Sequence, residues 1–257
     1  SNEFSFAENV TPVVIGPPAR HPFLWYLWLE FSLPRIFKRY KPDIFVSTDG
    51  YLSLSADVPS LAVIHDINFA HRPLDLPFLI RTYYKHYFPK FARKAKKIVT
   101  VSEYSKNDIS LTYSIDKDKI DVVYNGSNEL YQPLPEAQKE KTKQKYTNGA
   151  EYFIFIGSLI PRKNVSRLLQ AFDKFKTFTK TTAKLLIVGS PMFKTGDMKR
   201  KYAEMRHKND IVFTGRLNPA DLRDVLGSAL ALTFVPYFEG FGIPVLEAMY
   251  CDVPVIA

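Results

Sequence analysis

Short, continuously apolar runs recur through the second half of the chain, with helical patterns between them. A short apolar run bounded by turn residues is typical of a strand that is buried on both faces of a parallel sheet. Because these runs alternate with helical segments, we predict a doubly wound α/β domain. The predicted strands are Tyr152–Ile156, Lys184–Val188, Ile211–Thr214, Leu230–Val235 and Val253–Ile256.

Two asparagines mark where helices of this half begin. Asn164 precedes a segment with apolar residues at helical spacing, and Asn218 is followed by Pro219. Asparagine is a favoured N-cap, because its side chain accepts a hydrogen bond from a free backbone N–H, and proline suits the first helical position. The pattern predicts helices that begin after Asn164 and after Asn218.

The first half repeats this pattern less regularly. We predict an N-terminal Rossmann-like domain at 1–133, a linker with a solvated polar helix at 134–150, and a C-terminal domain at 151–257. We expect both domains to be incomplete, because the first lacks an opening strand with a Gly-rich turn and the second ends one residue after its last strand. The predicted elements of the first half are strands at Val10–Ile15, Ile44–Val46, Leu61–Ile64, Ile98–Val101 and Ile120–Tyr124, and helices near Phe23–Tyr40, Phe78–Lys97 and Ser105–Tyr113.

Lysine and arginine outnumber the acidic residues, which bears on the partners of the protein. The 257 residues carry a formal net charge of +9, of which +2 falls in residues 1–133 and +7 in residues 134–257. Such a chain favours acidic partners: nucleic acid, anionic lipid or phosphorylated small molecules. One cysteine, Cys251, excludes a disulfide within the chain, and no apolar run reaches the ~20 residues of a membrane-spanning helix. We therefore expect a cytoplasmic protein.

The two most unusual loops of the second half follow its first and fourth predicted strands. In the common strand order 3-2-1-4-5-6 these two strands are neighbours, and the loops after them meet where such sheets bind ligands. Residues 157–164 read Gly-Ser-Leu-Ile-Pro-Arg-Lys-Asn, and residues 236–242 read Pro-Tyr-Phe-Glu-Gly-Phe-Gly. We therefore place the ligand site between these loops.

The residue types in these loops suit a diphosphate. Gly157 lets the backbone approach a ligand closely. Arg162 and Lys163 bring positive charge to a helix N-terminus, which itself favours anions. Gly240 and Gly242 leave backbone N–H groups open before a second helix, and such groups stabilise a leaving diphosphate.

Two glutamates of the second loop and its helix suit sugar hydroxyls. Ionised carboxylates only accept hydrogen bonds, and hydroxyls donate them, so Glu239 suits a hexose and Glu247 suits the two hydroxyls of a ribose. Each of these features alone has an explanation that needs no ligand. The loop is then interpreted as a turn with surface charges, the spacing of the glutamates as a coincidence, and Glu247 as a favourable charge near a helix start. Their joint placement at one predicted switch point favours the ligand site.

The segment from Glu239 to Met249, Glu-Gly-Phe-Gly-Ile-Pro-Val-Leu-Glu-Ala-Met, closely resembles the Glu-x7-Glu signature of retaining GT-B glycosyltransferases, in particular family four. Residues 155–164 resemble the phosphate loop of a mannosyltransferase-like branch of that family. Val63–Asp66 and Ile98–Ser102 resemble segments of its acceptor domain. The resemblance implies a GT-B architecture, with two Rossmann-like domains that face a cleft.

The resemblance also implies roles for individual residues. It implies that Lys163 neutralises the donor diphosphate, that Glu247 binds the nucleotide ribose, and that Glu239 lies near the transferred sugar. Further matched positions are Gly240, Phe241 and Gly242 for the backbone cradle, Leu217 for the base, and His65 near the sugar.

The implied reaction moves a hexose, with mannose favoured, from a GDP- or UDP-linked donor to a glycan, lipid-linked or polysaccharide acceptor. It keeps the anomeric configuration and uses no metal or other cofactor. Ser158 stands where many relatives have arginine, and Arg162 is expected to compensate. A non-catalytic homologue or regulatory subunit that binds a nucleotide sugar is the alternative, and a phosphorylase of the same fold stays open. Nucleic acid is not expected as a partner, because no recognition motif accompanies the charge.

The stretch Arg81–Lys97 holds seven basic residues and no acidic one, interleaved with aromatic residues. We interpret it as a helix with buried rings and solvated lysines. The alternative is docking on anionic lipid, at the inner face of a membrane.

The sequence Asp116-Lys117-Asp118 spells the metal-binding Asp-x-Asp of other glycosyltransferases, but it precedes a strand, so we predict a turn. The five histidines lack metal-ligand spacing, and no metal site is predicted.

Overall fold

The computed structural model describes residues 7–18, 21–192 and 195–257. The described residues group into two compact units, each built around one parallel sheet. The first unit is formed by the chain up to His65 together with Phe78–Thr100 and Lys106–Val122. The second unit contains Asp66–Pro77, Val101–Ser105 and Val123–Ala257.

The sheet of the first unit has four parallel strands that lie side by side in sequence order. Four of the five strands predicted for this half form to within two residues, because their apolar side chains face the core: Ala62, Ile98 and Ile120 are fully buried. The strands are β1 Phe45–Ser47, β2 Ser60–Val63, β3 Lys97–Thr100 and β4 Ile120–Val122.

The predicted helices of this half also form. The first is interrupted by a π-helical turn that ends two positions before Pro34, a residue that has no N–H to donate. The side chain of Trp25 packs edge-on against Tyr83, with ring centroids 5.3 Å apart. The elements are α1 Pro22–Leu27, the π-turn Trp28–Ser32, α2 Leu33–Tyr40, α3 Asn68–His71, α4 Phe78–Lys94, α5 Glu103–Tyr113, and 3-10 turns at Pro73–Asp75 and Lys117–Lys119.

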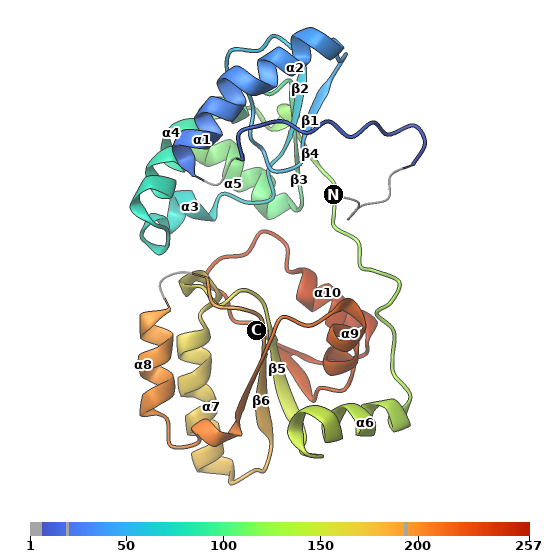
Figure 1. Cartoon of the computed structure of the whole chain (residues 1–257). Helices are drawn as coiled ribbons and strands as arrows, with labels where there is room; N and C mark the ends of the chain where they lie inside the picture. Colours follow the sequence, from blue (N-terminus) through green and yellow to red (C-terminus); the bar gives the residue numbers. More distant parts are fainter. Residues whose placement is uncertain (1–6, 19–20, 193–194) are drawn as a thin grey trace. The chain divides into compact units, whose positions relative to one another are not determined.

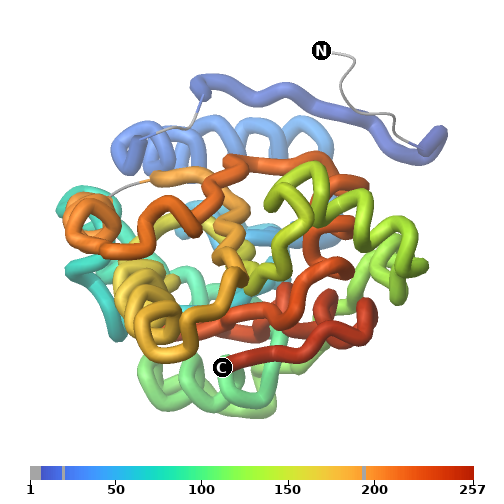
Figure 2. The backbone as a smooth tube through the Cα atoms, turned by 90° about the horizontal axis from the view of Figure 1, so that it is seen from below, coloured from blue at the N-terminus to red at the C-terminus, as the bar shows by residue number. Residues whose placement is uncertain are grey.

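The predicted strand at Val10–Ile15 is wrong. The segment runs extended (Figure 2), but it pairs with no strand in the described ranges, and Val14 is 99% exposed. β-Branched residues favour a strand only where a neighbouring strand supplies backbone partners and the side chains become half-buried. Neither condition holds here.

The sheet of the second unit has five parallel strands in the order β7-β6-β5-β8-β9. This order confirms the predicted topology, because β5 and β8, the first and fourth strands of this half, are paired neighbours. The strands are β5 Tyr152–Ile156, β6 Lys184–Val188, β7 Ile211–Gly215, β8 Ala231–Thr233 and β9 Val255–Ile256.

Helices cover both faces of this sheet: α7 and α8 lie on one face, and α6, α9 and α10 on the other (Figure 1). Alternate residues of β5 point to opposite faces, so Ile154 belongs to one buried cluster and Phe155 to the other. The helices are α6 Glu136–Thr147, α7 Val165–Thr179, α8 Gly196–Glu204, α9 Pro219–Gly227 and α10 Ile243–Tyr250, with 3-10 turns at Pro161–Lys163 and Lys208–Asp210.

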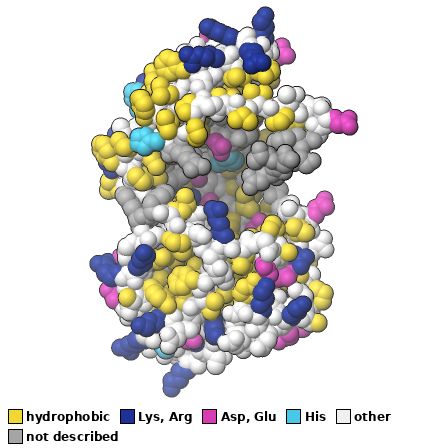
Figure 3. All heavy atoms as spheres, viewed as in Figure 1, with side chains coloured by type: hydrophobic (Ala, Val, Ile, Leu, Met, Phe, Trp, Pro, Cys, Tyr) yellow, Lys and Arg dark blue, Asp and Glu magenta, His cyan; other side chains and the backbone are white. Residues whose placement is uncertain are grey.

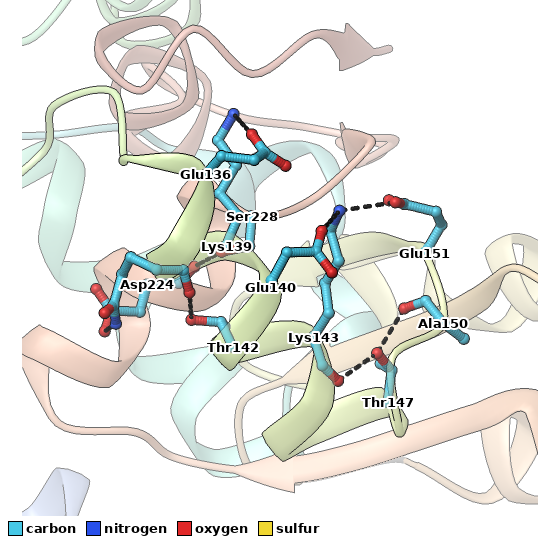
Figure 4. Close-up of polar contacts among 11 residues, drawn as sticks. Glu136, Lys139, Glu140, Thr142, Lys143, Thr147, Ala150, Glu151, Asp224 and Ser228 are labelled. Carbon is cyan, nitrogen blue, oxygen red and sulfur yellow. Dashed lines mark hydrogen bonds and ion pairs between the residues drawn. The ribbon is translucent and has the colours of Figure 1, made fainter.

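The polar helix α6 is not solvated all round, contrary to the expectation from its composition. Lys143 is buried, and its ammonium donates to Glu140 at 2.9 Å and to Glu151, just before β5, at 2.7 Å (Figure 4). The hydrogen bond to Glu151 raises the pKa of Lys143. Thr142 and Thr147 are buried on the same helix. Composition alone missed this contact because lysine buries its aliphatic stem while its charge stays paired.

We expect Lys143→Ala to lower the free energy of unfolding by about 1–2 kcal/mol, because it removes a buried stem and leaves two carboxylates without their cation. The carboxylates are partly exposed, which keeps the loss below that of a fully buried pair. Lys141→Ala, on the exposed side of the same helix, is the matched control and should change stability by less than about 0.5 kcal/mol. Urea unfolding measures both, and equal stabilities would contradict the anchoring role.

Candidate functional site

The loops that follow β5 and β8 are in direct contact at the carboxyl edge of the second sheet. The N–H of Tyr237 donates to the carbonyl of Arg162 at 2.9 Å. The Arg162 guanidinium donates to the carbonyl of Phe238 at 2.7 Å. Paired parallel strands end at one edge, so loops far apart in sequence meet there, as the strand order predicts.

Two glycines allow the backbone of the first loop to pass against the end of β6. A Cβ atom on Gly189 would lie 1.9 Å from the carbonyl oxygen of Gly157. Both residues have positive φ, +152° for Gly157 and +141° for Gly189, a region that glycine enters without steric cost. Gly157 was predicted from the sequence and Gly189 was not, although its position directly after the predicted strand Lys184–Val188 was an available signal.

Asn164 does not cap α7 as predicted. Its backbone is left-handed, with φ 60° and ψ 27°, whereas an N-cap needs extended backbone. Its side-chain amide instead donates to the carbonyl of Val235 at 2.9 Å, which ties the two loops together. Asn218 does cap α9, and its side-chain oxygen accepts from the N–H of Asp221 at 2.9 Å.

Arg162, Lys163 and Glu239 form an ion cluster, called here the Arg-Lys-Glu cluster. The Lys163 ammonium lies 2.5 Å and the Arg162 guanidinium 3.1 Å from the same oxygen of Glu239. The side chain of Arg162 is only 14% exposed, that of Lys163 12% and that of Glu239 23%. Two cations share one carboxylate, so the cluster keeps an excess positive charge in a place where water screens it weakly.

Open backbone N–H groups follow the cluster directly. Within the described residues, no acceptor binds the N–H groups of Gly240, Phe241, Gly242 or Ile243. Gly242 has a left-handed backbone, φ +100°, and its carbonyl accepts the first N–H bonds of α10. The first N–H groups of a helix have no partner inside it and carry the positive end of its dipole. The excess positive charge of the Arg-Lys-Glu cluster and these unpaired N–H groups together favour the binding of an anion.

Glu247 lies in the second turn of α10, where it is half-buried. Burial raises the pKa of the Glu247 carboxyl, and the neutral hydroxyl of Tyr131 opposes the rise. Tyr131, which is buried in the same cluster as Ala248 of α10, was not predicted from the sequence, because nothing in the local pattern of residues 127–135 shows which helix it packs against.

The two remaining predicted site residues lie in different units. Leu217 follows β7 in the second unit and packs, partly buried, against the cluster that contains Val225 and Ala248. His65 lies in the first unit two positions after the end of β2, where its Nε2 is 3.0 Å from the carbonyl oxygen of Thr48. The structure therefore brings Arg162, Lys163 and Glu239 of the second unit into contact with one another, whereas His65 belongs to the first unit.

Asp116, Lys117 and Asp118 form a turn, as predicted. The Asp116 carboxylate accepts from the N–H of Asp118 at 2.9 Å and begins the short 3-10 turn before β4. Among the residues that the structure describes, no group of three or more His, Cys, Asp or Glu side chains is arranged to hold a metal ion. No helix in the same residues is long and apolar enough to cross a membrane.

Two family models match the chain. The model described as Glycosyltransferase Family 4 matches residues 1–129, and the model described as Glycosyl transferases group 1 matches residues 136–257. The chain is 26% identical over 241 residues to the O-antigen chain mannosyltransferase RfbU of Salmonella typhimurium, covering 91% of this chain and 62% of that protein. It is 27% identical over 218 residues to the O-antigen chain mannosyltransferase B of Escherichia coli, covering 84% and 57%.

Solved glycosyltransferase structures are similar in fold. The structure of Anabaena Alr3699/HepE in complex with UDP and glucose matches with a TM-score of 0.70 at 19% identity. The match covers 86% of this chain and 60% of the HepE chain. The structure of WaaG, a glycosyltransferase involved in lipopolysaccharide biosynthesis, has a TM-score of 0.69 at 18% identity, with 87% and 61% covered. The chain thus spans about three-fifths of the length of the proteins that it matches.

We expect Glu247→Gln to stabilise the fold at neutral pH by about 0.5–1 kcal/mol, since it removes a partly buried charge. A carboxyl whose pKa is raised on folding stabilises the fold fully below its unfolded pKa, and this stabilisation is lost as the pH rises through the folded pKa. The gain from the substitution should therefore be largest at neutral pH and shrink towards pH 4. Thermal unfolding at several pH values measures it, with the exposed Glu129→Gln as control; a gain that does not depend on pH contradicts the assignment.

Proposed function

The chain belongs to glycosyltransferase family 4 and has the α/β GT-B fold of such enzymes, and we propose that it carries out retaining transfer of a hexose from a nucleoside diphosphate sugar. The observation that carries the proposal is the Arg-Lys-Glu cluster, which places excess positive charge beside the open N–H groups of residues 240–243. In this family, the anion expected to bind such a site is a diphosphate.

The cluster and the open N–H groups would stabilise the diphosphate as it leaves. Negative charge builds on the bridging oxygen when the bond to the sugar breaks, and fixed cations and N–H dipoles stabilise that charge without reorganising. Lys163 and Arg162 are already held in place by Glu239, so little ordering is required when the donor binds. The proposed reaction is independent of metal ions.

The acidic and apolar residues of the site suit the rest of the donor. Glu239 adjoins the diphosphate site and would accept hydrogen bonds from the hexose, whereas Glu247 would accept them from the ribose. Leu217, which is partly buried beside the same core cluster, would meet the base. Gly157 keeps the first loop clear of side-chain atoms where the donor approaches.

The proposed transfer proceeds on one face of the sugar. The bond between the anomeric carbon and the diphosphate oxygen breaks, the acceptor oxygen forms its bond on the same side, and the proton of the acceptor hydroxyl passes to the leaving diphosphate. The anomeric configuration is thereby kept. His65, which lies two positions after the end of β2 in the first unit, is assigned a place near the sugar by analogy with the family.

We favour a mannose-type donor because two relatives that match most of this chain are O-antigen chain mannosyltransferases. A structural neighbour binds UDP and glucose, so UDP-linked donors are the second choice after GDP-linked ones. The acceptor is proposed to be a glycan, lipid-linked or polysaccharide chain. A non-catalytic homologue that only binds the nucleotide sugar would show binding without turnover, and a phosphorylase would require inorganic phosphate.

We expect Lys163→Ala to lower kcat/KM for sugar transfer at least about 100-fold, because it removes the cation that stabilises the leaving group. Transfer and hydrolysis of GDP-mannose and UDP-glucose are measured on the purified protein by release of the nucleoside diphosphate.

Lys174→Ala, an exposed lysine of α7 in the same unit, is the matched control and should leave turnover unchanged. Near-normal turnover of the Lys163 variant would refute the leaving-group role. Tight nucleotide binding by the natural sequence, with no turnover of either donor and no phosphate-dependent cleavage, would favour the non-catalytic alternative.

We further propose that the first unit docks on anionic lipid through an aromatic and basic patch formed by Tyr26, Phe31, Tyr87, Lys85 and Lys90. Tyr26 lies 6.1 Å from Phe31 and 6.2 Å from Tyr87 between ring centroids, and the Lys90 ammonium lies 5.6 Å from the Tyr87 ring. Phe31 is 47% exposed, and both lysines are exposed. Hydrophobic side chains gather on this unit with Lys and Arg beside them (Figure 3). Exposed rings and lysines together favour the interface of an anionic bilayer.

Reversal of both charges, Lys85→Glu with Lys90→Glu, should weaken binding to vesicles of phosphatidylglycerol and phosphatidylcholine at least about tenfold. The matched control reverses Lys174 and Lys199, two exposed lysines of the second unit. Vesicle sedimentation measures both variants, with pure phosphatidylcholine as reference. An equal loss of vesicle binding in the two variants would contradict a specific docking patch. So would binding of the natural protein that does not depend on the charge of the lipid. Either result would leave the interpretation of a helix with solvated lysines.

A further inference from the structure

A cavity of about 120 Å³ lies beside the first loop of the site, within the second unit. Its wall is formed by the end of that loop, by the first turns of α7 and α8, by Tyr237 of the second loop, and by Arg72, which belongs to the same unit. One water molecule takes up ~30 Å³ of liquid, so the cavity has room for part of a larger ligand. No residue of the Arg-Lys-Glu cluster lines it, and it is therefore a second feature of this edge.

The wall contains one buried oxygen atom that lacks a hydrogen bond. The side-chain oxygen of Asn164 has no hydrogen-bond partner within the residues that the structure describes. The amide nitrogen of the same side chain donates to the carbonyl of Val235 at 2.9 Å, and this bond fixes the orientation, because a flipped amide would bring two oxygens together. Buried polar atoms are rarely left unpaired. The oxygen is therefore an acceptor that a ligand hydroxyl could satisfy.

The charges of the wall are already balanced. Arg72 and Asp197 are the charged residues among the described residues that line the cavity. The Arg72 guanidinium donates to Asp75 at 2.6 Å, and the Asp197 carboxylate accepts from Arg200 at 2.7 Å. The wall is thus polar without excess charge, and a charged ligand would lose solvation there without gaining an unpaired opposite charge. This lining favours a neutral ligand, whereas the Arg-Lys-Glu cluster favours an anion.

Apolar and aromatic side chains complete the wall and are held in place. Leu159 is 3% exposed, and its N–H donates to the carbonyl of Ser190 at 3.1 Å, which joins the loops after β5 and β6. The Arg72 guanidinium lies 4.3 Å from the centre of the Tyr237 ring, a cation–π contact. Apolar walls with a few fixed polar groups are typical of a site for a small molecule.

We propose that this cavity binds a neutral sugar residue of the acceptor, beside the proposed diphosphate site. The hydroxyls of a sugar donate hydrogen bonds to the Asn164 oxygen and to the Asp197 carboxylate, and its C–H groups pack against the apolar wall. Asn164 directly follows Lys163, so an acceptor bound there contacts the loop that holds the leaving group. This inference rests on the proposed function, because an acceptor is needed only if the chain transfers a sugar.

The first test removes one polar group of the wall. Asp197→Ala is compared with Glu204→Ala, because each residue forms an i,i+3 ion pair on α8 and Glu204 lies outside the wall. NMR titration of the purified protein with methyl α-D-mannopyranoside measures glycoside binding, and calorimetry measures the Kd of GDP and UDP. We expect Asp197→Ala to raise the Kd of the glycoside about 5- to 10-fold and to leave both nucleotide Kd values within about twofold. Glu204→Ala should change none of them.

The second test fills the cavity with a side chain. Ser166, in the first turn of α7, lines the wall. A ring at this position occupies the space of the sugar, so Ser166→Tyr should weaken glycoside binding at least about tenfold. Gln170→Tyr places the same ring on the exposed side of α7 and is the matched control, which should bind the glycoside like the natural protein.

Monodeoxy probes supply a readout that a purely structural role of Asp197 would not move. Each of the four monodeoxy derivatives of methyl α-D-mannopyranoside lacks one hydroxyl. If Asp197 accepts from a hydroxyl, one derivative should bind the natural protein about 5- to 10-fold more weakly than the parent glycoside, and Asp197→Ala should weaken that derivative no further. Losses that add for every derivative would contradict the contact.

The outcomes separate this inference from the proposed function. Glycoside binding that is equal in Asp197→Ala, Ser166→Tyr and their controls, or that does not saturate, would overturn the inference and leave the proposed function in place. Tighter binding of mannose 6-phosphate than of the methyl glycoside would also overturn it, because the neutral wall does not favour an anion. Failure of the natural protein to bind GDP or UDP would overturn the proposed function, and the acceptor role with it, even where the glycoside binds.

Discussion

The contact of two cations with a single carboxylate oxygen determines how the proposed donor site is built. Arg162 and Lys163 come from the loop after β5, and Glu239 comes from the loop after β8, 77 positions from Arg162 and 76 from Lys163. The carboxylate removes the repulsion between the cations and holds them in fixed positions, yet it leaves one positive charge unbalanced. A site with two carboxylates would be neutral and would bind anions poorly, whereas cations without a carboxylate would be more solvated and less ordered.

The strand order places this contact at the sheet edge. Since β8 pairs with β5, the chain must cross the other strands of the sheet before it returns, and the two loops meet only after the sheet has formed. The close approach of Gly157 to Gly189 and the amide bond from Asn164 to Val235 then fix the first loop in place. The sheet thus orders the cations before any ligand arrives, which is the condition for electrostatic stabilisation of a leaving group.

Hydrophobic periodicity correctly predicted the strands whose position depends on burial in the sheet. The strands Tyr152–Ile156 and Lys184–Val188 were predicted at their observed bounds, because the sheet interior selects continuous apolar runs. Features that depend on tertiary partners were predicted wrongly or missed. Val10–Ile15 has the composition of a strand and no neighbour, Asn164 binds a distant carbonyl in place of its own helix, and Tyr131 reaches a helix that lies far ahead in sequence. None of these contacts leaves a local pattern.

The two glutamates of the signature illustrate how environment divides work between identical side chains. Glu239 is surrounded by cations, and its charge is used to position them. Glu247 is half-buried, and this burial raises the pKa of its carboxyl. A cation beside Glu247 would stabilise its carboxylate, but it would also occupy the lone pairs that the proposed contact with a ribose needs. In the residues that the structure describes, Glu247 forms no ion pair, and the burial that raises its pKa is a cost in stability that the proposed role would explain.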